Sequence, residues 1–269
     1  MPRLERVRIY PVKGLDATEV DSVEVLDGGT LAGDREFALF DAGAVTGAGG
    51  VDGNPHGNGV FNAKHSDRFH VLDTAYDPET AEVTVETDGG SREFDLDNER
   101  NAASAWFSEV FDHDLTLRRD GSLGFVDRRG MGPAVVSTAT LETVASWFDD
   151  MSVESARRRL RANLEVSGVP AFWEDRFVGD DAPAFAVGGA RFEGVTPCAR
   201  CVVPERDPET GDPTPEFRDR FVRKREATFP EWADEDAFDH FYTLMLIARV
   251  PERDRGRTLR VGDPVEVVD

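Results

Sequence analysis

Lysine is almost absent from this chain of 269 residues. Lys13, Lys64 and Lys224 are the three lysines, so arginine supplies nearly all of the 31 basic residues, against 53 acidic ones. The formal net charge is −22. Nucleic acids and anionic membranes are bound through clustered basic side chains, so we expect neither as a partner. An acidic excess of this size is typical of a protein that works at molar salt, and we interpret the source as a halophile.

Cysteine and long apolar runs are also scarce. The two cysteines, Cys198 and Cys201, are three positions apart, which argues against a framework of disulfides. The longest apolar run, residues 241–250, is about half of the roughly 20 residues that cross a bilayer. The first residues lack the apolar stretch of a secretory signal. We therefore expect a cytoplasmic protein without a membrane segment.

Short apolar segments separated by turn residues predict a fold rich in antiparallel strands. Strands are expected at residues 4–12, 23–25, 35–40, 68–72, 82–86, 92–96, 115–117, 134–136, 164–167, 184–187, 191–195, 242–249 and 259–268. Apolar residues at helical spacing predict one helix over 99–111, capped by Asn98, and another that begins at Ser137 or Thr138. A short arginine-rich helix follows. The predicted fold class is α+β, mostly antiparallel barrel-like sheets with a few peripheral helices.

A polar stretch over residues 118–131 divides the chain. It predicts two domains, residues 1–119 and 128–269, whose strands can interlace. Residues 42–60 are rich in glycine and too long for an ordinary loop, so we interpret them as a mobile insertion or a lid.

Cys198-Ala199-Arg200-Cys201 is the sharpest local motif. A zinc site would need further paired ligands, and a thioredoxin-like pair would sit before a helix, whereas an apolar strand is expected after these cysteines. Two buried small side chains are the plain structural alternative. Arg200 favours a functional thiol, because a cation beside a thiol favours the thiolate that a soft metal centre binds.

A basic cluster at residues 157–163 stands out in an acidic chain. For Arg157 and Arg158 we prefer a solvated helix face that pairs with Glu and Asp. Arg161 and Asn163 are two positions apart on what we expect to be an extended segment, so they share a face. A guanidinium and an amide together fit a phosphate or the edge of a pterin.

Five motifs, in order along the chain, resemble those of the MOSC superfamily, the domains similar to the C-terminal domain of molybdenum-cofactor sulfurase, which include the amidoxime-reducing component proteins. They are Tyr10-Pro11-Val12-Lys13-Gly14, Gly33-Asp34-Arg35, residues 161–168, Cys198-Ala199-Arg200-Cys201 with Asp207-Pro208-Glu209-Thr210-Gly211, and Val261-Gly262-Asp263-Pro264-Val265. Gly14 stands where the amidoxime-reducing branch has serine, and Ala162 where proline is usual. These departures weaken the likeness to that branch more than the expectation of a cofactor.

The resemblance implies a MOSC N-terminal β-barrel-type domain followed by a MOSC domain. It implies that Cys201 is the thiolate ligand of molybdenum and the catalytic residue. The residues implied to bind the molybdopterin cofactor are Lys13, Arg35, Arg161, Asn163 and Arg200.

An oxidoreductase that removes oxygen from small N-hydroxylated compounds is the leading hypothesis for the function. No four-cysteine motif for an iron–sulfur cluster occurs in the chain, so a separate ferredoxin- or flavin-type protein would supply the electrons. The alternative is a molybdenum-cofactor carrier, or a sulfur-transfer module that takes a persulfide on Cys201 from a sulfur donor. A barrel that binds neither group is the third hypothesis.

Overall fold

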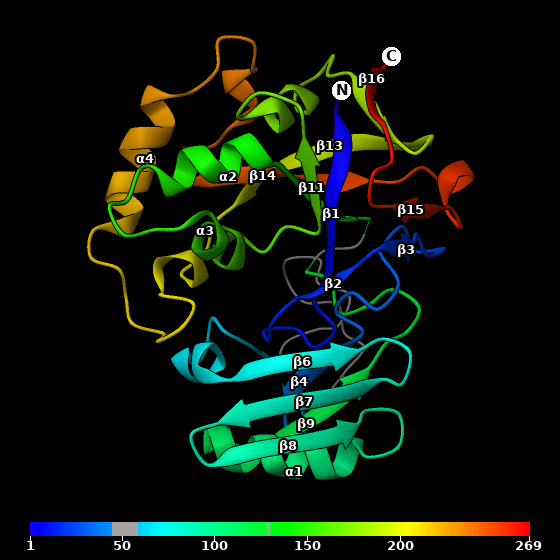
Figure 1. Cartoon of the computed structure of the whole chain (residues 1–269), viewed down its shortest axis with the longest axis vertical. Helices are drawn as coiled ribbons and strands as arrows, with labels where there is room; N and C mark the ends of the chain where they lie inside the picture. The colour runs from blue at the N-terminus through cyan, green and yellow to red at the C-terminus, as the bar shows by residue number, and fades with distance from the viewer. Residues whose placement is uncertain (45–58, 128–129) are drawn as a thin grey trace.

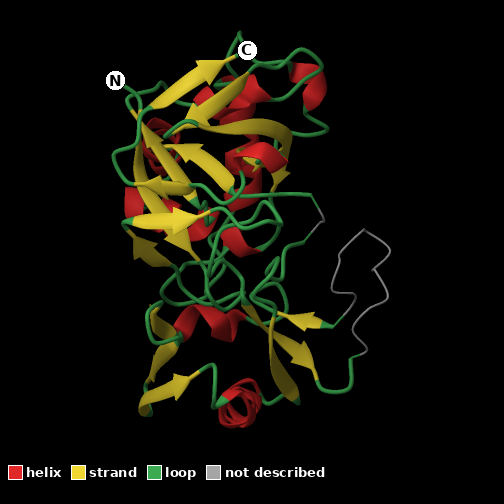
Figure 2. Ribbon diagram, turned by 90° about the vertical axis from the view of Figure 1, so that its right-hand side faces the viewer, coloured by secondary structure: helices red, strands yellow, loops and turns green. Residues whose placement is uncertain are grey.

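The computed structural model describes residues 1–44, 59–127 and 130–269. These residues form a mixed α+β fold with four α-helices and four sheets (Figure 1). An upper part, built on the largest sheet, holds both chain termini, and a lower part holds two smaller sheets (Figures 1 and 2). Most of the predicted insertion or lid at 42–60 lies outside the described residues.

The upper part is organised by an eight-stranded sheet of order β16-β12-β13-β14-β10-β11-β1-β2. Its strands are β1 (Arg3–Ile9), β2 (Thr18–Val20), β10 (Ala134–Ser137), β11 (Leu164–Ser167), β12 (Ala184–Val187), β13 (Ala190–Ala199), β14 (Thr243–Arg249) and β16 (Val265–Val268). All neighbours are antiparallel except β10 and β11. Because β1 pairs with β11, the beginning of the chain is built into the sheet of its second half.

Both faces of this sheet are covered. Successive strand residues point to opposite faces, so Val135 joins one buried cluster with Leu4 and Phe185, and Val136 joins another with Leu141. The second cluster lies under α2 (Thr138–Ala145) and α4 (Phe217–Ala227). With α3 (Val153–Leu160), these helices gather on one side of the sheet (Figure 1).

The helix at Ser137 confirms the predicted cap. Ser137 ends β10, and its Oγ accepts a hydrogen bond from the Thr140 N–H at 3.0 Å, which satisfies one free donor at the start of α2. The arginine-rich helix is α3, which Ser152 caps in the same way. Sequence analysis missed α4, whose residues are mostly charged.

The lower part contains two three-stranded sheets and one helix. The sheets have the orders β5-β4-β9 and β6-β7-β8. Their elements are β4 (Phe37–Asp41), β5 (Val60–Phe61), β6 (Asp73–Asp77), β7 (Glu82–Thr87), β8 (Gly90–Asp95) and β9 (Leu115–Arg119), with α1 (Arg100–Phe111). Ala103, Phe107 and Phe111 of α1 are buried in the core of this part, as their helical spacing predicts.

Several short elements complete the described chain. A two-stranded sheet joins β3 (Ser22–Glu24) to β15 (Thr258–Arg260). The 3₁₀ helices are η1 (Asp67–Val71), η2 (Trp173–Phe177), η3 (Val203–Glu205), η4 (Glu235–Ala237) and η5 (Glu252–Asp254). None of the helices in the described residues is long and apolar enough to cross a membrane.

The structure departs from three expectations about the fold. The mixed α+β class is confirmed, but none of the described sheets closes on itself, so the barrel-like description is not confirmed. The strand predicted at 68–72 is wrong: η1 lies there, because the buried residues Phe69 and Leu72 are three apart, which is the spacing of a helical turn. The N-cap of α1 is Glu99 rather than Asn98.

Candidate functional site

Two short segments near the N-terminus bring Lys13 and Arg35 together. The Lys13 N–H donates to the Phe37 carbonyl, and the Arg35 N–H donates to the Tyr10 carbonyl, each at 2.8 Å. Arg35 has a φ of 54°, in the left-handed region, which turns the chain between Asp34 and the start of β4. The two cations that the motifs singled out therefore lie on adjacent segments where the upper part meets the lower part.

Lys13 is largely buried. Its Nζ donates to the Phe125 carbonyl at 2.7 Å and to Asp127 Oδ1 at 2.6 Å. Burial lowers the pKa of Lys13, and Asp127 opposes this shift. Burial would raise the pKa of Asp127, but the charges of Lys13 and its neighbours outweigh it and lower that pKa to about 2. Asp127 is therefore charged at neutral pH.

Tyr10 joins Arg35 to Arg161 from a distant part of the chain. The Arg35 guanidinium lies 5.3 Å from the centroid of the Tyr10 ring, and that of Arg161 lies 4.2 Å from it. The Tyr10 hydroxyl donates to the Ala162 carbonyl at 3.2 Å. Arg161 Nη2 donates to the Leu15 carbonyl at 2.6 Å, and Arg35 also pairs with Asp34. Tyr10 was not singled out by the sequence analysis, although it begins the first motif.

Arg161 and Asn163 do not share a face of an extended segment. Arg161 is the left-handed C-cap of α3, with a φ of 59°, and β11 begins only at Leu164. The Asn163 side chain is buried: its Oδ1 accepts from the Ala134 N–H at 3.1 Å, and its Nδ2 donates to the Arg8 carbonyl at 3.0 Å. Asn163 thus joins the strands beneath the site, and only the Arg161 side chain reaches the other cations.

The cysteine motif lies at the end of β13. Arg200 Nη1 donates to Cys198 Sγ at 3.1 Å, and its Nη2 donates to the Leu160 carbonyl at 3.0 Å. Arg200 therefore contacts Cys198 rather than Cys201, and it joins the cysteine segment to the end of α3, next to Arg161. Arg200 Nε is buried and has no hydrogen-bond partner. An unpartnered buried donor costs free energy, so a bound group that accepts a hydrogen bond from this atom would be favoured.

Both cysteines are free and partly buried, on opposite sides of the segment. Cys198 packs against the core under α2 and α4, and Cys201 packs against the core of the lower part. The Tyr242 hydroxyl donates to the Cys201 carbonyl at 3.3 Å and to Glu205 Oε1 at 3.2 Å, which fixes the backbone at Cys201. The strand expected after Cys201 is the 3₁₀ helix η3 instead.

The residues present fit a cofactor that brings its own metal ligands. Among the described residues, no group of three or more His, Cys, Asp or Glu side chains is placed to hold a metal ion. A metal bound by Cys201 would therefore take most of its ligands from the cofactor. The cations around Tyr10 and the unpartnered Arg200 Nε suit an anionic, hydrogen-bonding cofactor.

The arginines of α3 have partners of their own. Arg157 pairs with Glu154 at 2.6 Å and with Glu165 at 2.7 Å. Arg158 lies within 4 Å of Asp16 and Glu209. The predicted pairing with acidic residues is confirmed, although the Arg157 side chain is only 11% exposed rather than solvated.

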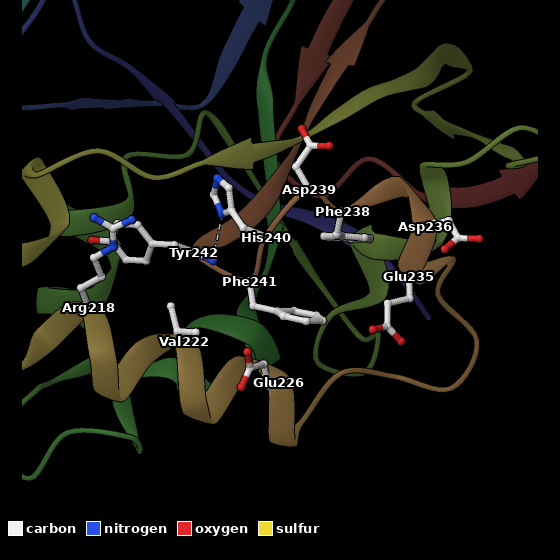
Figure 3. Close-up of a pocket in the computed structure, with 10 residues that line it drawn as sticks. All are labelled: Arg218, Val222, Glu226, Glu235, Asp236, Phe238, Asp239, His240, Phe241 and Tyr242. Carbon is white, nitrogen blue, oxygen red and sulfur yellow. Dashed lines mark hydrogen bonds between the residues drawn. The ribbon is translucent and has the colours of Figure 1, made fainter.

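A separate hollow of about 560 Å³ lies between α4 and residues 235–242 (Figure 3). Four carboxylates, three aromatic rings, Arg218, Val222 and His240 line it. The Tyr242 ring, under the Arg218 guanidinium, stands between this hollow and the backbone of Cys201. Sequence analysis gave no sign of this hollow.

Comparison with known families agrees with the order of the motifs. The family described as MOSC domain matches residues 129–266. The family described as MOSC N-terminal beta barrel domain matches residues 1–152. No curated protein is similar enough to the chain to count as a match. Each family match covers more than half of the chain, and we conclude that this protein belongs to the MOSC-domain family and carries its N-terminal domain.

Proposed function

We propose that this protein is a molybdenum-dependent oxidoreductase that reduces small N-hydroxylated compounds with electrons from a separate ferredoxin- or flavin-type protein. MOSC domains are typically molybdenum-cofactor-binding. The observation that carries the proposal is the meeting of Arg35 and Arg161 on the Tyr10 ring, with Lys13 on the segment beside Arg35. Leu160 and Arg200 join this group to the cysteine segment. In a chain of net charge −22, such a group of cations favours an anionic ligand.

Each of these residues has a role toward the cofactor. Cys201 would hold the metal through its thiolate, on a backbone that Tyr242 fixes. Arg161 and Arg35 would bind the phosphate and pterin edges, because a guanidinium donates two parallel hydrogen bonds. Lys13 would add a point charge, and Arg200 would donate its Nε–H. Asn163 would act through the backbone that it joins.

The bound molybdenum centre would supply the two-electron chemistry. Reduction of an N-hydroxyl group breaks the N–O bond, consumes two electrons and two protons, and releases water. The donor protein would supply the electrons and solvent the protons. The chain itself would bind and orient the cofactor and exclude water from the thiolate.

We also propose that the chain is divided into domains 1–119 and 128–269. The same proposal includes a halophilic source, a cytoplasmic location, and no nucleic-acid or membrane partner. The matched families overlap over residues 129–152, which supports interlaced domains.

Turnover by the Cys201→Ala variant tests the proposed reaction. With a chemical reductant and an N-hydroxylated amidine, the wild-type protein reduces the substrate, and the variant keeps its melting temperature but loses turnover. Retained turnover in the variant would rule out the thiolate mechanism.

Sulfur transfer is the second candidate function. Two free, partly buried thiols three positions apart support it, because sulfur transfer needs a thiol that can receive sulfur and lies outside a disulfide. Mass spectrometry of cofactor-free protein after incubation with a persulfide donor tests it. An added sulfur atom on Cys201 supports sulfur transfer, and an unmodified Cys201 argues against it.

A further inference from the structure

His70 lies in an arginine-rich group of side chains at the edge of the candidate site. It belongs to η1 in the lower part and faces the loop that follows the cysteine segment. The loop approaches closely: Gly211 has a φ of +76°, and a Cβ there would lie 3.0 Å from the Asp67 carbonyl and 3.5 Å from His70 Cβ. Two parts of the molecule thus meet at His70.

Positive charge surrounds the ring. Burial, followed by the charges of Arg161, Arg206, Arg159 and Arg158, lowers the pKa of His70 to about 4. Four carboxylates pair with three of these arginines. They are Asp16, Asp67, Asp207 and Glu209, and their side chains are 28% to 80% exposed. Three of the four, Glu209, Asp207 and Asp67, are more exposed than the arginine that they face, so solvent screens their charges more.

Three side chains in this group have nitrogen atoms that lack a hydrogen-bond partner or could bind a further one. His70 Nε2 and Arg206 Nη1 are buried and have no hydrogen-bond partner, and the nearest carboxylate oxygen to Arg206 Nη1 is 3.9 Å away. Among the described residues, the Arg161 side chain donates one hydrogen bond, to the Leu15 carbonyl, and forms no ion pair. The other arginines are engaged: Arg159 donates to two backbone carbonyls and Asp207, and Arg158 donates to the Pro208 carbonyl.

We propose that His70, Arg161 and Arg206 form a binding site for a tetrahedral oxyanion of the phosphate class. A phosphate presents several acceptor oxygens and up to two negative charges, which match two guanidinium groups and a neutral imidazole. His70 is neutral above pH 5, so one ring nitrogen carries the proton, and the anion selects the tautomer that donates from Nε2. Arg161 connects the site to the Tyr10 cluster.

Two sources share this chemistry: the phosphate of the proposed cofactor and a free phosphorylated molecule. The oxyanion site itself does not depend on molybdenum, since none of its three residues is a proposed metal ligand. Only the first source rests on the proposed function.

Calorimetric titration of cofactor-free protein with inorganic phosphate, at pH 7 and constant ionic strength in KCl, tests the site. We expect saturable binding to the wild-type protein at one site. Arg206→Gln weakens it by about tenfold or more, because a charge-assisted contact is lost. His70→Ala weakens it by about threefold to tenfold. Arg253→Gln, the same change of charge at a side chain that is 73% exposed, leaves the affinity within about twofold.

Melting temperatures of all variants show whether they fold. If His70→Ala fails to fold, Arg206→Gln with its Arg253→Gln control carries the test alone. Absence of phosphate binding to the wild-type protein overturns the proposal, as does equal weakening by Arg206→Gln and Arg253→Gln.

The same titration of cofactor-loaded protein identifies the source. Loss of phosphate binding upon loading assigns the site to the phosphate of the cofactor. Binding that persists after loading assigns it to a free phosphorylated ligand. If the protein takes up no cofactor, the proposed function is contradicted. The titration of cofactor-free protein still decides whether the oxyanion site exists.

Discussion

Arg161 and Asn163 show how different the contacts of two neighbouring motif residues can be. The Asn163 amide is 2% exposed and bonds to the backbone of Ala134 and Arg8. Arg161 stacks on Tyr10 and keeps donors for a ligand. We therefore expect Asn163 to contribute to stability and Arg161 to binding.

Substitution separates these two roles. Asn163→Ala leaves a buried N–H and a buried carbonyl unpaired, so we expect it to lower the free energy of unfolding by about 1–3 kcal/mol. Arg161→Gln loses a cation–π contact, and we expect a loss of about 1 kcal/mol together with a several-fold fall in bound pterin. Chemical denaturation and pterin fluorescence measure the two effects. An Asn163→Ala variant of wild-type stability that lacks pterin would show that the amide binds the cofactor itself.

At the scale of single elements, η2 contains the most unusual carboxyl group. Glu174 and Asp175 are both buried beside the fully buried Arg225. Asp175 Oδ2 accepts from Arg225 Nη2 at 2.5 Å, whereas Glu174 Oε1 has no partner. Burial, together with the charge of Asp175, raises the pKa of Glu174 to about 8. Glu174 is therefore protonated in the folded protein at neutral pH.

This shift makes stability depend on pH. A carboxyl group with a raised pKa in the folded state binds a proton that the unfolded chain has released, so its stabilisation is lost as pH rises toward 8. We expect the melting temperature to fall between pH 6.5 and pH 8.5, and Glu174→Gln to remove most of this fall. Glu266→Gln, at an exposed position, is the control. Equal pH profiles for wild type and Glu174→Gln would contradict a buried, protonated Glu174.

Elements with clear local periodicity could be predicted from the sequence. Strands β11 and β12 and helix α1 lie within one residue of the expected ranges, because their apolar spacing alone decides which face is buried. Helix α4 could not be predicted: beyond Phe217 and Phe221 it buries Arg225, and that burial depends on Asp175, 50 positions away. Periodicity alone does not reveal such a partner.

The sequence predicted a set of candidate site residues but not their geometry. Resemblance to a family singled out Lys13, Arg35 and Arg161, yet the approach of the two arginines to Tyr10 depends on pairing between distant segments. One local signal was available and was not used. Cys198 and Arg200 are two positions apart at the end of a strand, and this spacing places them on one side, where the structure shows their contact.

The charge of the whole molecule sets its response to salt. Most arginines pair with carboxylates, as Arg157 does with Glu165, and the excess of acidic residues remains. In dilute salt the excess acidic side chains repel one another, and this repulsion destabilises the compact state.

Added salt should therefore stabilise the fold. Raising KCl from about 0.1 M to 1 M shortens the screening length from about 10 Å to about 3 Å, and we expect the melting temperature to rise by several degrees. Thermal unfolding followed by circular dichroism measures this, with sucrose as an uncharged control. A melting temperature that is independent of KCl would contradict adaptation to high salt.

The molybdenum and pterin content per chain tests whether the Cys201 thiolate binds the metal of the cofactor. Wild-type protein, Cys201→Ser and Cys198→Ser would be purified from a molybdenum-replete host and analysed side by side. We expect about one molybdenum per chain in the wild type and in Cys198→Ser, and loss of the metal in Cys201→Ser, because a thiolate binds this soft centre and a hydroxyl does not. Molybdenum retained in Cys201→Ser, or lost only in Cys198→Ser, would contradict the assignment of Cys201 as the ligand.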